Sequence, residues 1–207
     1  MGSGFGGMKR IVEAIILTGL IACIHGAGWC ADLGLNSARV IVPDKKYDSL
    51  TVVKASLIPG AGNGLFAAVK IKKDAVIGEY GGRLISEQEY PKDNEYVAEL
   101  LECAWKDAYP YRYIDGKDHG GKVTKINFAP SKINRIETHF QNAAIKQLCQ
   151  RPYFVYVAIR DIEPGAEIWA SYGPNYDYYK FMHLPKVRDY FCALIKTDCR
   201  KNFVYYH

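Results

Sequence analysis

The chain has 207 residues, and its hydrophobic fraction of 49% is sufficient for the core of one globular domain. Its net charge of +5 is spread along the sequence without a block of like charges, so we expect no direct binding of nucleic acid. None of the six cysteines stands in a C-x-x-C pair, which argues against a structural zinc site. Tyrosine is frequent, with 16 residues, and it either packs in a core or lines a groove with its ring and hydroxyl.

The beginning of the chain does not have the pattern of a folded domain. A short basic opening, Met8–Arg10, precedes a largely apolar run from Ile11 to Ile24. This order is typical of a secretory signal peptide, and the run is too short to span a bilayer. We therefore predict a leader at residues 1–31 and an exported protein, secreted (with delivery to a host cell) or else periplasmic. Two alternatives are a lipid anchor on Cys23, within a sequence that resembles a bacterial lipoprotein processing site, and an amphipathic helix packed on the domain.

A glycine-rich loop separates two strand-like runs. Within Ser56–Ala68, three glycines follow a proline at every second position, Gly60, Gly62 and Gly64. Glycine adopts backbone angles that a Cβ forbids and lets a ligand approach the main chain closely. Such a loop can form one wall of a pocket for a small charged molecule. An ordinary tight turn uses the same residues, and the loop alone does not distinguish the two.

The remaining pattern predicts many short strands and few helices, and therefore a mainly β domain with short helices (α+β). Leu65–Ile71 and Ala75–Tyr80, with a turn at Lys72–Asp74 between them, predict a hairpin. The other predicted strands are Leu50–Leu57, Arg83–Ile85, Tyr111–Asp115, Tyr153–Ile159 and Ala166–Tyr172.

Helix signals are confined to three places. Ser86 and Glu89 have the spacing of a capping box at a helix start. A further helix is predicted around Pro185–Ile195. The i, i+3, i+4, i+7 spacing of a helix face occurs at Val97, Leu100, Leu101 and Ala104.

Three stretches lack a regular pattern. Residues 32–49 are polar and are predicted as a linker or a frayed first strand. Lys117–Lys125 is rich in glycine and charge and is predicted as an exposed loop. Ile126–Ala144 mixes polar and apolar residues without a period, and irregular segments of this kind often carry functional sites.

Four cysteines remain if the leader is removed: Cys103, Cys149, Cys192 and Cys199. They allow three disulfide pairings, of which Cys192–Cys199 joins the two closest in sequence. In a reducing compartment all four would be buried thiols.

Three segments, in this order, resemble the SET domain of protein-lysine methyltransferases. Ile58–Ala67 resembles the opening loop of that family, with Gly62-Asn63-Gly64 at its Gly-x-Gly motif. Val76–Ile85 resembles the strand pair that follows, and Val157–Gly173 resembles the closing signature, an acidic strand that ends on a tyrosine. The resemblance covers residues 50–176, and residues 177–207 are predicted as a C-terminal tail that closes the site.

The resemblance implies a fold, a reaction and a set of site residues. The fold is a β-clip of small curled sheets with a C-terminal pseudoknot. The reaction is methyl transfer from S-adenosylmethionine to lysine side chains of a protein substrate, such as a histone, without a metal. Tyr172 matches the catalytic tyrosine and Tyr80 a second tyrosine of the lysine channel, which Trp169 and Tyr176 could wall. The matched cofactor-binding residues are Gly62, Asn63, Gly64, Leu65, Phe66, His139, Asn142 and Tyr172.

One segment departs from the family pattern. The family carries Asn-His-Ser-Cys-x-Pro-Asn before its late strands, whereas the matching stretch here is Asn134–Asn142. Asn142 matches the end of the motif, and a small shift places His139 on the histidine, but the cysteine and proline are absent. The competing interpretation is therefore a degenerate SET domain that binds protein without catalysis. A secreted structural β protein, in which the glycine loop is only a turn, is a third interpretation.

Overall fold

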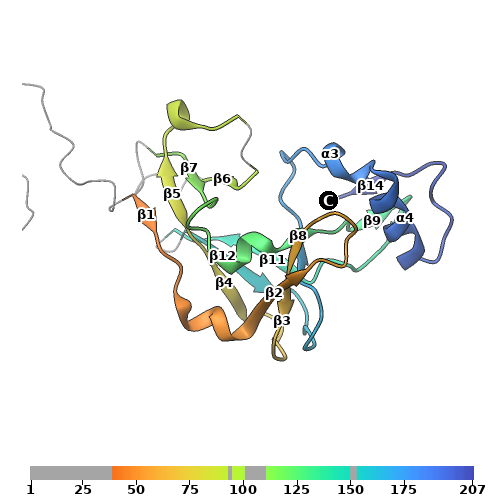
Figure 1. Cartoon of the computed structure of the whole chain (residues 1–207), viewed down its shortest axis with the longest axis horizontal. Helices are drawn as coiled ribbons and strands as arrows, with labels where there is room; N and C mark the ends of the chain where they lie inside the picture. Colours follow the sequence, from red (N-terminus) through yellow and green to blue (C-terminus); the bar gives the residue numbers. More distant parts are fainter. Residues whose placement is uncertain (1–38, 93–94, 101–110, 150–152) are drawn as a thin grey trace, which may run out of the picture. The chain divides into compact units, whose positions relative to one another are not determined.

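The computed structural model describes residues 39–92, 95–100, 111–149 and 153–207 (Figure 1). The predicted leader at residues 1–31, with Cys23, lies outside these ranges, as do Leu101, Cys103 and Ala104. Within the described ranges, no helix has the length and apolar character needed to cross a membrane.

Small sheets supply most of the regular secondary structure among the described residues, and the predicted fold class, mainly β with short helices, is confirmed. A four-stranded antiparallel sheet has the order β1 (Val40–Ile41), β5 (Gly82–Ile85), β7 (Tyr113–Asp115) and β6 (Val97–Glu99). Two three-stranded sheets have the orders β11 (Ala143–Gln147), β12 (Phe154–Ala158), β4 (Val76–Tyr80) and β10 (Ile136–Glu137), β9 (Lys132–Ile133), β14 (Tyr205–Tyr206). Two strand pairs complete the set: β2 (Thr51–Ala55) with β3 (Asn63–Ala67), and β13 (Trp169–Ala170) with β8 (Asn127–Phe128).

Short helices connect these strands. Among the described residues, three are 3₁₀ helices, η1 (Lys45–Leu50), η2 (Glu87–Glu89) and η3 (Lys122–Lys125), and the α-helices of the tail are α3 (Tyr179–Met182) and α4 (Pro185–Leu194). Figure 1 shows α3 and α4 beside β9 and β14, on the side of the glycine loop away from β5, β6 and β7.

Elements with a strong local signal form where the sequence predicts them. Leu50–Leu57 contains β2, Tyr153–Ile159 contains β12, and Pro185–Ile195 contains α4, which begins on its proline because that residue needs no hydrogen-bonded amide there. The Ser86 amide donates to Glu89 Oε2 at 2.9 Å, as a capping box requires, although only one 3₁₀ turn follows.

The predicted hairpin of Leu65–Ile71 with Ala75–Tyr80 is wrong. β3 pairs with β2, and β4 pairs with β12. The connection between β3 and β4 instead bonds to a segment far along the chain, because Ile71 and Ile162 exchange hydrogen bonds of 2.9 and 2.8 Å. A local pattern identifies a strand but not its distant partner.

The helix predicted from the spacing at Val97 is also wrong in the described part. Val97–Glu99 is β6, paired in register with Tyr113–Asp115, so tertiary pairing overrides a helical pattern of only a few residues. The loop predicted at Lys117–Lys125 contains η3 and is not exposed throughout. Val123 is 3% exposed and packs where a Cβ at Gly78 would lie. The residues predicted as a linker or first strand include β1 and most of η1.

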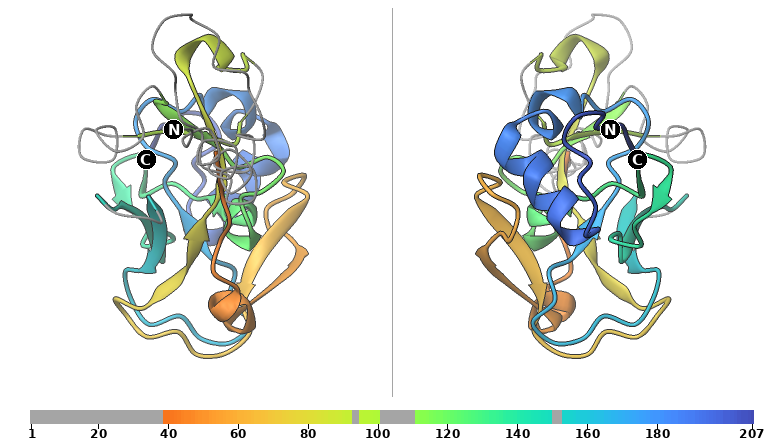
Figure 2. Two further views of the ribbon diagram at one scale, coloured as in Figure 1. Left: turned by 90° about the vertical axis from the view of Figure 1, so that its left-hand side faces the viewer. Right: turned by 90° about the vertical axis from the view of Figure 1, so that its right-hand side faces the viewer.

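The segment that leads to Tyr172 is held from two sides, so only Trp169–Ala170 of the predicted strand Ala166–Tyr172 is a regular strand. On one side, the amides of Ala67 and Ile168 bond to Ala166 and Leu65. On the other, β13 runs parallel to β8, and the Asn142 amide donates to the Trp169 carbonyl at 3.0 Å. Figure 2 shows the orange β2–β3 pair and the teal β11–β12 pair on opposite sides of the described structure.

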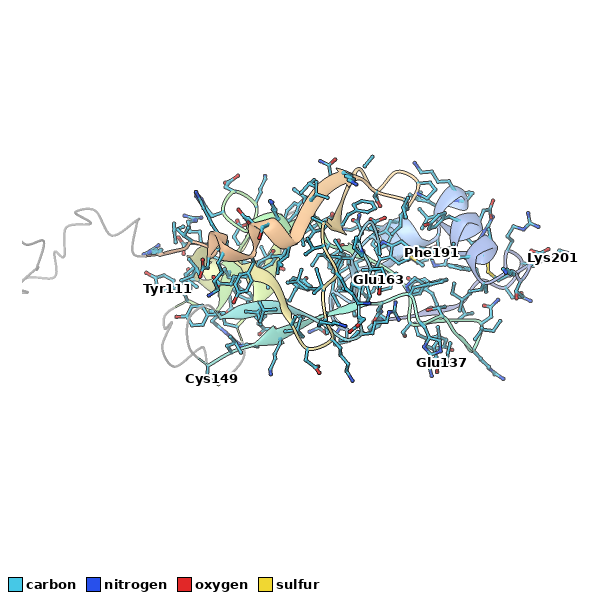
Figure 3. The ribbon with its side chains drawn as sticks, turned by 90° about the horizontal axis from the view of Figure 1, so that it is seen from below. Tyr111, Glu137, Cys149, Glu163, Phe191 and Lys201 are labelled. Atoms are coloured by element: carbon cyan, nitrogen blue, oxygen red, sulfur yellow. A yellow bond between two sulfur atoms is a disulfide. The ribbon has the colours of Figure 1, made fainter. Side chains whose placement is uncertain are left out.

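A hydrophobic cluster joins the tail to the segment that leads to Tyr172. Its buried members include Phe128, Tyr178, Met182, Phe191 and the glycine-loop residue Ile58, and we refer to it as the tail cluster. A disulfide joins Cys192 and Cys199, the two closest in sequence of the four cysteines considered, and is visible beside Phe191 and Lys201 in Figure 3. Cys149 is also disulfide-bonded.

Candidate functional site

The glycine loop is a closed, rigid turn with open space on one side. The Ser56 amide donates to the Gly62 carbonyl at 2.8 Å and closes it, and Gly60 and Gly62 take φ angles of +84° and +72°. A Cβ at Gly62 would meet no atom within 4 Å, whereas a Cβ at Gly64 would overlap Glu167 Oε1. Positive φ is strained for residues other than glycine, so the loop shape depends on these glycines.

Glu167 anchors the loop to the strand that ends at Tyr172. Its carboxylate is buried, with 4% of the residue exposed. It accepts hydrogen bonds from Ser56 Oγ and the Leu57 amide, both at 2.7 Å, and from Asn127 Nδ2 at 3.1 Å. A buried charge is tolerated only with such partners, so Glu167 fixes the position of the loop. The sequence indicates an acidic strand here, but motif matching does not identify Glu167 as part of the site.

Tyr172 lies among aromatic rings at the end of that strand. Its hydroxyl donates to the Ile126 carbonyl at 2.8 Å, and its amide donates to Tyr178 Oη at 2.9 Å. The Tyr176 ring packs edge-on against it, with 4.8 Å between ring centroids. Burial raises the pKa of Tyr172 well above its usual value, and the Tyr156 phenol adds to the shift. Tyr172 is therefore a neutral phenol at physiological pH.

Tyr80 and Tyr156 lie on the same face of one sheet. Tyr156 is opposite Gly78 in the register of β12 and β4, and Tyr80 is two residues along β4. The Tyr80 hydroxyl donates to the Tyr96 carbonyl at 2.6 Å. Burial raises the pKa of Tyr80, and the Tyr156 phenol contributes to that shift as it does at Tyr172. Tyr156 is thus near both matched tyrosines. Motif matching does not identify Tyr156, although the alternation of Tyr153–Ile159 places it on the inner face.

The two predicted residues of the Asn134–Asn142 stretch, Asn142 and His139, differ in their contribution to the site. Asn142 is buried, its Nδ2 donates to the Glu167 carbonyl at 2.8 Å, and its Oδ1 accepts from the Trp169 amide at 2.9 Å. It therefore joins this stretch to the Glu167 strand. His139 is exposed, has a φ of +53°, and makes no side-chain hydrogen bond or ring contact with the described residues. The structure brings Asn142, but not the His139 side chain, into the framework around Glu167.

The remaining matched residues follow the glycines along β3. Leu65 is fully buried, and its carbonyl accepts from the Ile168 amide at 2.7 Å. The Phe66 ring is buried beneath Lys54, whose Nζ is 5.7 Å from the ring centroid. Asn63 is exposed at the start of the strand, and its carbonyl accepts from Asn127.

Two observations at this loop fit a small polar ligand such as S-adenosylmethionine. The open space beside Gly62 leaves room for it, and the indole Nε1 of Trp169 is a buried donor that has no hydrogen-bond partner among the described residues. Buried donors are rarely left unpaired in native proteins, so Trp169 Nε1 is suited to a ligand or a water. A cavity of about 500 Å³ lies elsewhere, between residues 42–53 and 118–125, and none of the matched residues lines it.

Comparison with known proteins identifies the same part of the chain. Residues 62–173, from the glycine loop to the residue after Tyr172, match the family model described as the SET domain. A search of curated proteins finds no match. Similar solved structures include ATXR5 in complex with histone H3.1 mono-methylated on R26, with 22% identity and a TM-score of 0.50 over 64% of this chain and 62% of that one.

Two further structures have lower TM-scores. The methyltransferase domain of human PR domain-containing protein 2 has 19% identity and a TM-score of 0.47, over 63% of this chain and 82% of that one. The ctPRC2 polycomb repressive complex 2 of Chaetomium thermophilum, bound to S-adenosylmethionine, has 25% identity and a TM-score of 0.48, over 64% of this chain. The matched region is 16% of the ctPRC2 chain and, as given above, under two thirds of ATXR5.

Proposed function

The chain belongs to the SET-domain family, and from this premise we propose that it transfers methyl groups from S-adenosylmethionine to lysine side chains of a protein substrate. One observation carries the proposal: Glu167, which lies within the matched residues, joins the glycine loop at Ser56 and Leu57 to the strand that ends on Tyr172. The two walls of a cofactor site are thereby held in a fixed relation to a neutral tyrosine.

The residues that would hold the cofactor are those around the glycine loop. Gly62 and Gly64 present main-chain groups to its methionine part, and Asn142 holds the opposite wall in place through the 167–169 segment. Trp169 Nε1 is a free donor for a polar group of the ligand. When bound, S-adenosylmethionine supplies a methyl group on a positively charged sulfonium.

The remaining task of the protein is to neutralise and align the substrate amine. A lysine amine has a reference pKa of about 10.4 and is mostly protonated at neutral pH. The aromatic surroundings of Tyr80, Tyr156 and Tyr172 disfavour an ammonium through desolvation, so the proton leaves to water. The neutral amine would then be the nucleophile toward the methyl group that the bound cofactor would supply. Alignment of two reactants contributes roughly 7–11 kcal/mol, and no acid–base pair is required.

Tyr172 is the residue we assign to this alignment. Its high pKa keeps the phenol neutral, and its bond to the Ile126 carbonyl fixes the direction of the hydroxyl. Tyr80 is held in the same way by the Tyr96 carbonyl and would position the amine from the β4 side.

The test is transfer of labelled methyl from S-adenosylmethionine to basic proteins. Histones are the first substrate to try, because ATXR5 was solved with histone H3.1. Tyr172→Phe should lower turnover about 10²-fold, the typical cost of a misplaced reacting group. Tyr179→Phe, at a tyrosine that is 69% exposed, is the matched control and should be unaffected. Full activity of Tyr172→Phe would contradict the assignment of Tyr172 to alignment of the substrate amine.

A protein-binding module without catalysis is the second candidate function. It is favoured by His139, whose exposed side chain makes no hydrogen bond or ring contact with the described residues, and by Asn142, whose amide is engaged in holding the strand. A module of this kind would bind a protein partner but neither bind nor turn over S-adenosylmethionine.

We also propose that the protein is exported. The Cys192–Cys199 disulfide and the disulfide of Cys149 support this, because oxidising compartments maintain such bonds. Expression of the full chain in bacteria, followed by fractionation and mass determination, tests the proposal. A product found in the cytoplasm with residues 1–31 intact would contradict export, and a lipid on Cys23 would identify the anchored alternative.

A further inference from the structure

Helix α4 of the tail lies across the glycine loop. A Cβ at Gly60 would overlap Nζ of Lys186, which places this lysine directly on the loop. Tyr190 follows one turn later on the same helix face. Phe191 packs against Trp169, with 6.4 Å between ring centroids. Helix α4 therefore contacts the loop through Lys186 and, through Phe191, the ring of Trp169, whose Nε1 has no partner among the described residues.

The surroundings of Tyr190 show which side of α4 is turned toward the loop. Burial raises its pKa, and the negative charge of Glu167 adds to the shift, so the Tyr190 phenol is near the carboxylate that anchors the loop. Figure 3 shows Phe191 on the inner side of the same helix. The geometry of Lys186, Tyr190 and Phe191 makes α4 the third wall of the site, beside the loop and the Glu167 strand.

Lys186 is an uncompensated positive charge at this wall. It lies in the first turn of α4, where the helix dipole disfavours a cation, and that turn contains no acidic residue. Its ammonium forms no ion pair or hydrogen bond with the described residues. By contrast, Arg188 in the next turn is paired with Asp189 at 3.2 Å. The Lys186 ammonium beside Gly60 is therefore available to pair with an anionic group.

We propose that Lys186 binds the carboxylate of the methionine part of S-adenosylmethionine. The inference rests on the proposed function and deepens it, because it names a binding residue outside the family match at residues 62–173. The main chain of the loop offers only amides and carbonyls, whereas an ammonium forms a charge-assisted bond to a carboxylate, about twice as strong as a neutral one. Lys186 is exposed and flexible, so its side chain can move from Gly60 to the ligand.

Lys54 is a second lysine beside the loop and could compete for this role. Lys54 is opposite Gly64 in the register of β2 and β3. Its Nζ is directed to the Phe66 ring, 5.7 Å from the centroid, on the strand side and not at Gly60. Lys54 is therefore the matched control, a lysine beside the same loop whose charge is already engaged.

The experiment compares two ligands on four proteins by calorimetry. The ligands are S-adenosylmethionine and decarboxylated S-adenosylmethionine, which lacks only the carboxylate. The proteins are the wild type, Lys186→Ala, Lys186→Arg and Lys54→Ala. We expect Lys186→Ala to weaken S-adenosylmethionine binding roughly tenfold or more, the loss expected for one charged hydrogen bond, and to leave binding of the decarboxylated ligand unchanged. Lys186→Arg should retain most of the affinity, and Lys54→Ala should bind both ligands like the wild type.

Three outcomes would overturn the inference. Equal weakening of both ligands in Lys186→Ala would mean that the lysine supports the helix and not the carboxylate. Unchanged binding of both ligands would mean that it does neither, and a carboxylate-selective loss in Lys54→Ala alone would assign the role to that residue. If the wild type binds neither ligand, the proposed function fails and the inference fails with it. In the three outcomes above the wild type still binds S-adenosylmethionine, so failure of the inference alone can be distinguished from failure of the proposed function.

Discussion

Gly64 and Glu167 are in such close contact that a Cβ on Gly64 would overlap the Oε1 atom of the glutamate. The same oxygen accepts from Ser56 Oγ, so the carboxylate occupies the inside of the glycine loop. The strand that carries Glu167 ends at Tyr172. The position of the loop and the position of the tyrosine are therefore determined by one buried side chain.

Glu167→Gln should destabilise the protein and weaken cofactor binding. A glutamine cannot accept hydrogen bonds from Ser56, Leu57 and Asn127 together, because its amide nitrogen is a donor. We expect a loss of roughly 1–3 kcal/mol in the free energy of unfolding, the cost of one unpaired buried group. Denaturant titration measures it. Glu163→Gln, on the same segment but paired with Lys70 at the surface, is the control and should change little. Equal stabilities of the two variants would contradict the anchoring role.

Gly62→Ala should lower cofactor affinity more than its backbone strain explains. Gly62 and Gly165 have φ angles of +72° and +84°, and a Cβ at either would meet no atom within 4 Å. Both alanine variants should therefore lose a similar 1–2 kcal/mol of stability, about the cost of a left-handed alanine. Only Gly62→Ala should weaken S-adenosylmethionine binding, because its methyl group fills the space that we assign to the ligand. Calorimetry that finds the two variants equal in affinity would place the ligand elsewhere.

Removal of the Cys192–Cys199 disulfide should loosen the tail and weaken the site. The two cysteines are buried in the tail cluster, together with Tyr178, whose hydroxyl accepts from the Tyr172 amide. A cross-link over so short a loop contributes about 2–3 kcal/mol. The double variant Cys192→Ala/Cys199→Ala should therefore unfold at lower denaturant concentration and bind cofactor less tightly. Unchanged binding in a measurably destabilised variant would show that the tail and the site are independent.

Alkaline pH should destabilise the fold through its buried tyrosines. Burial raises the pKa of Tyr80, Tyr156 and Tyr172, whereas an unfolded tyrosine titrates near about 10. The unfolded state therefore loses protons first. The contribution to stability is constant below about pH 10 and is lost as the pH rises above it, by roughly 1.4 kcal/mol per pH unit for each such tyrosine. Denaturant titrations between pH 8 and 11 should show this slope, reduced in Tyr80→Phe. If Tyr80→Phe has the same slope as the wild type, the raised pKa of Tyr80 in the folded protein is contradicted.

The sequence predicts those parts of the fold whose signal is local. β2, β12, α4 and the Ser86–Glu89 turn follow from strand patterns, a helix-starting proline and a capping pair. The partner of β4 could not be predicted in this way, because its pairing with β12 depends on contacts between distant segments. The same limit applies to Val97–Glu99, where pairing with β7 outweighs a helical spacing.

The same distinction applies to the candidate site: the sequence predicts residues that belong to a local motif but not residues whose role depends on packing. Motif matching identifies the glycine loop, Tyr80 and Tyr172, and their roles stay predictions. Glu167 and Tyr156 could not be assigned from sequence, because an acidic residue and an inward tyrosine in strands are ordinary until their neighbours are known. Lys186 follows only from the packing of α4 on Gly60.

Calorimetric titration of S-adenosylmethionine into the purified protein tests the central claim most directly. The cofactor site that we assign to the glycine loop, the Glu167 strand and α4 predicts micromolar binding of one cofactor per chain. An absence of heat at millimolar cofactor would contradict the claim and favour a protein-binding module.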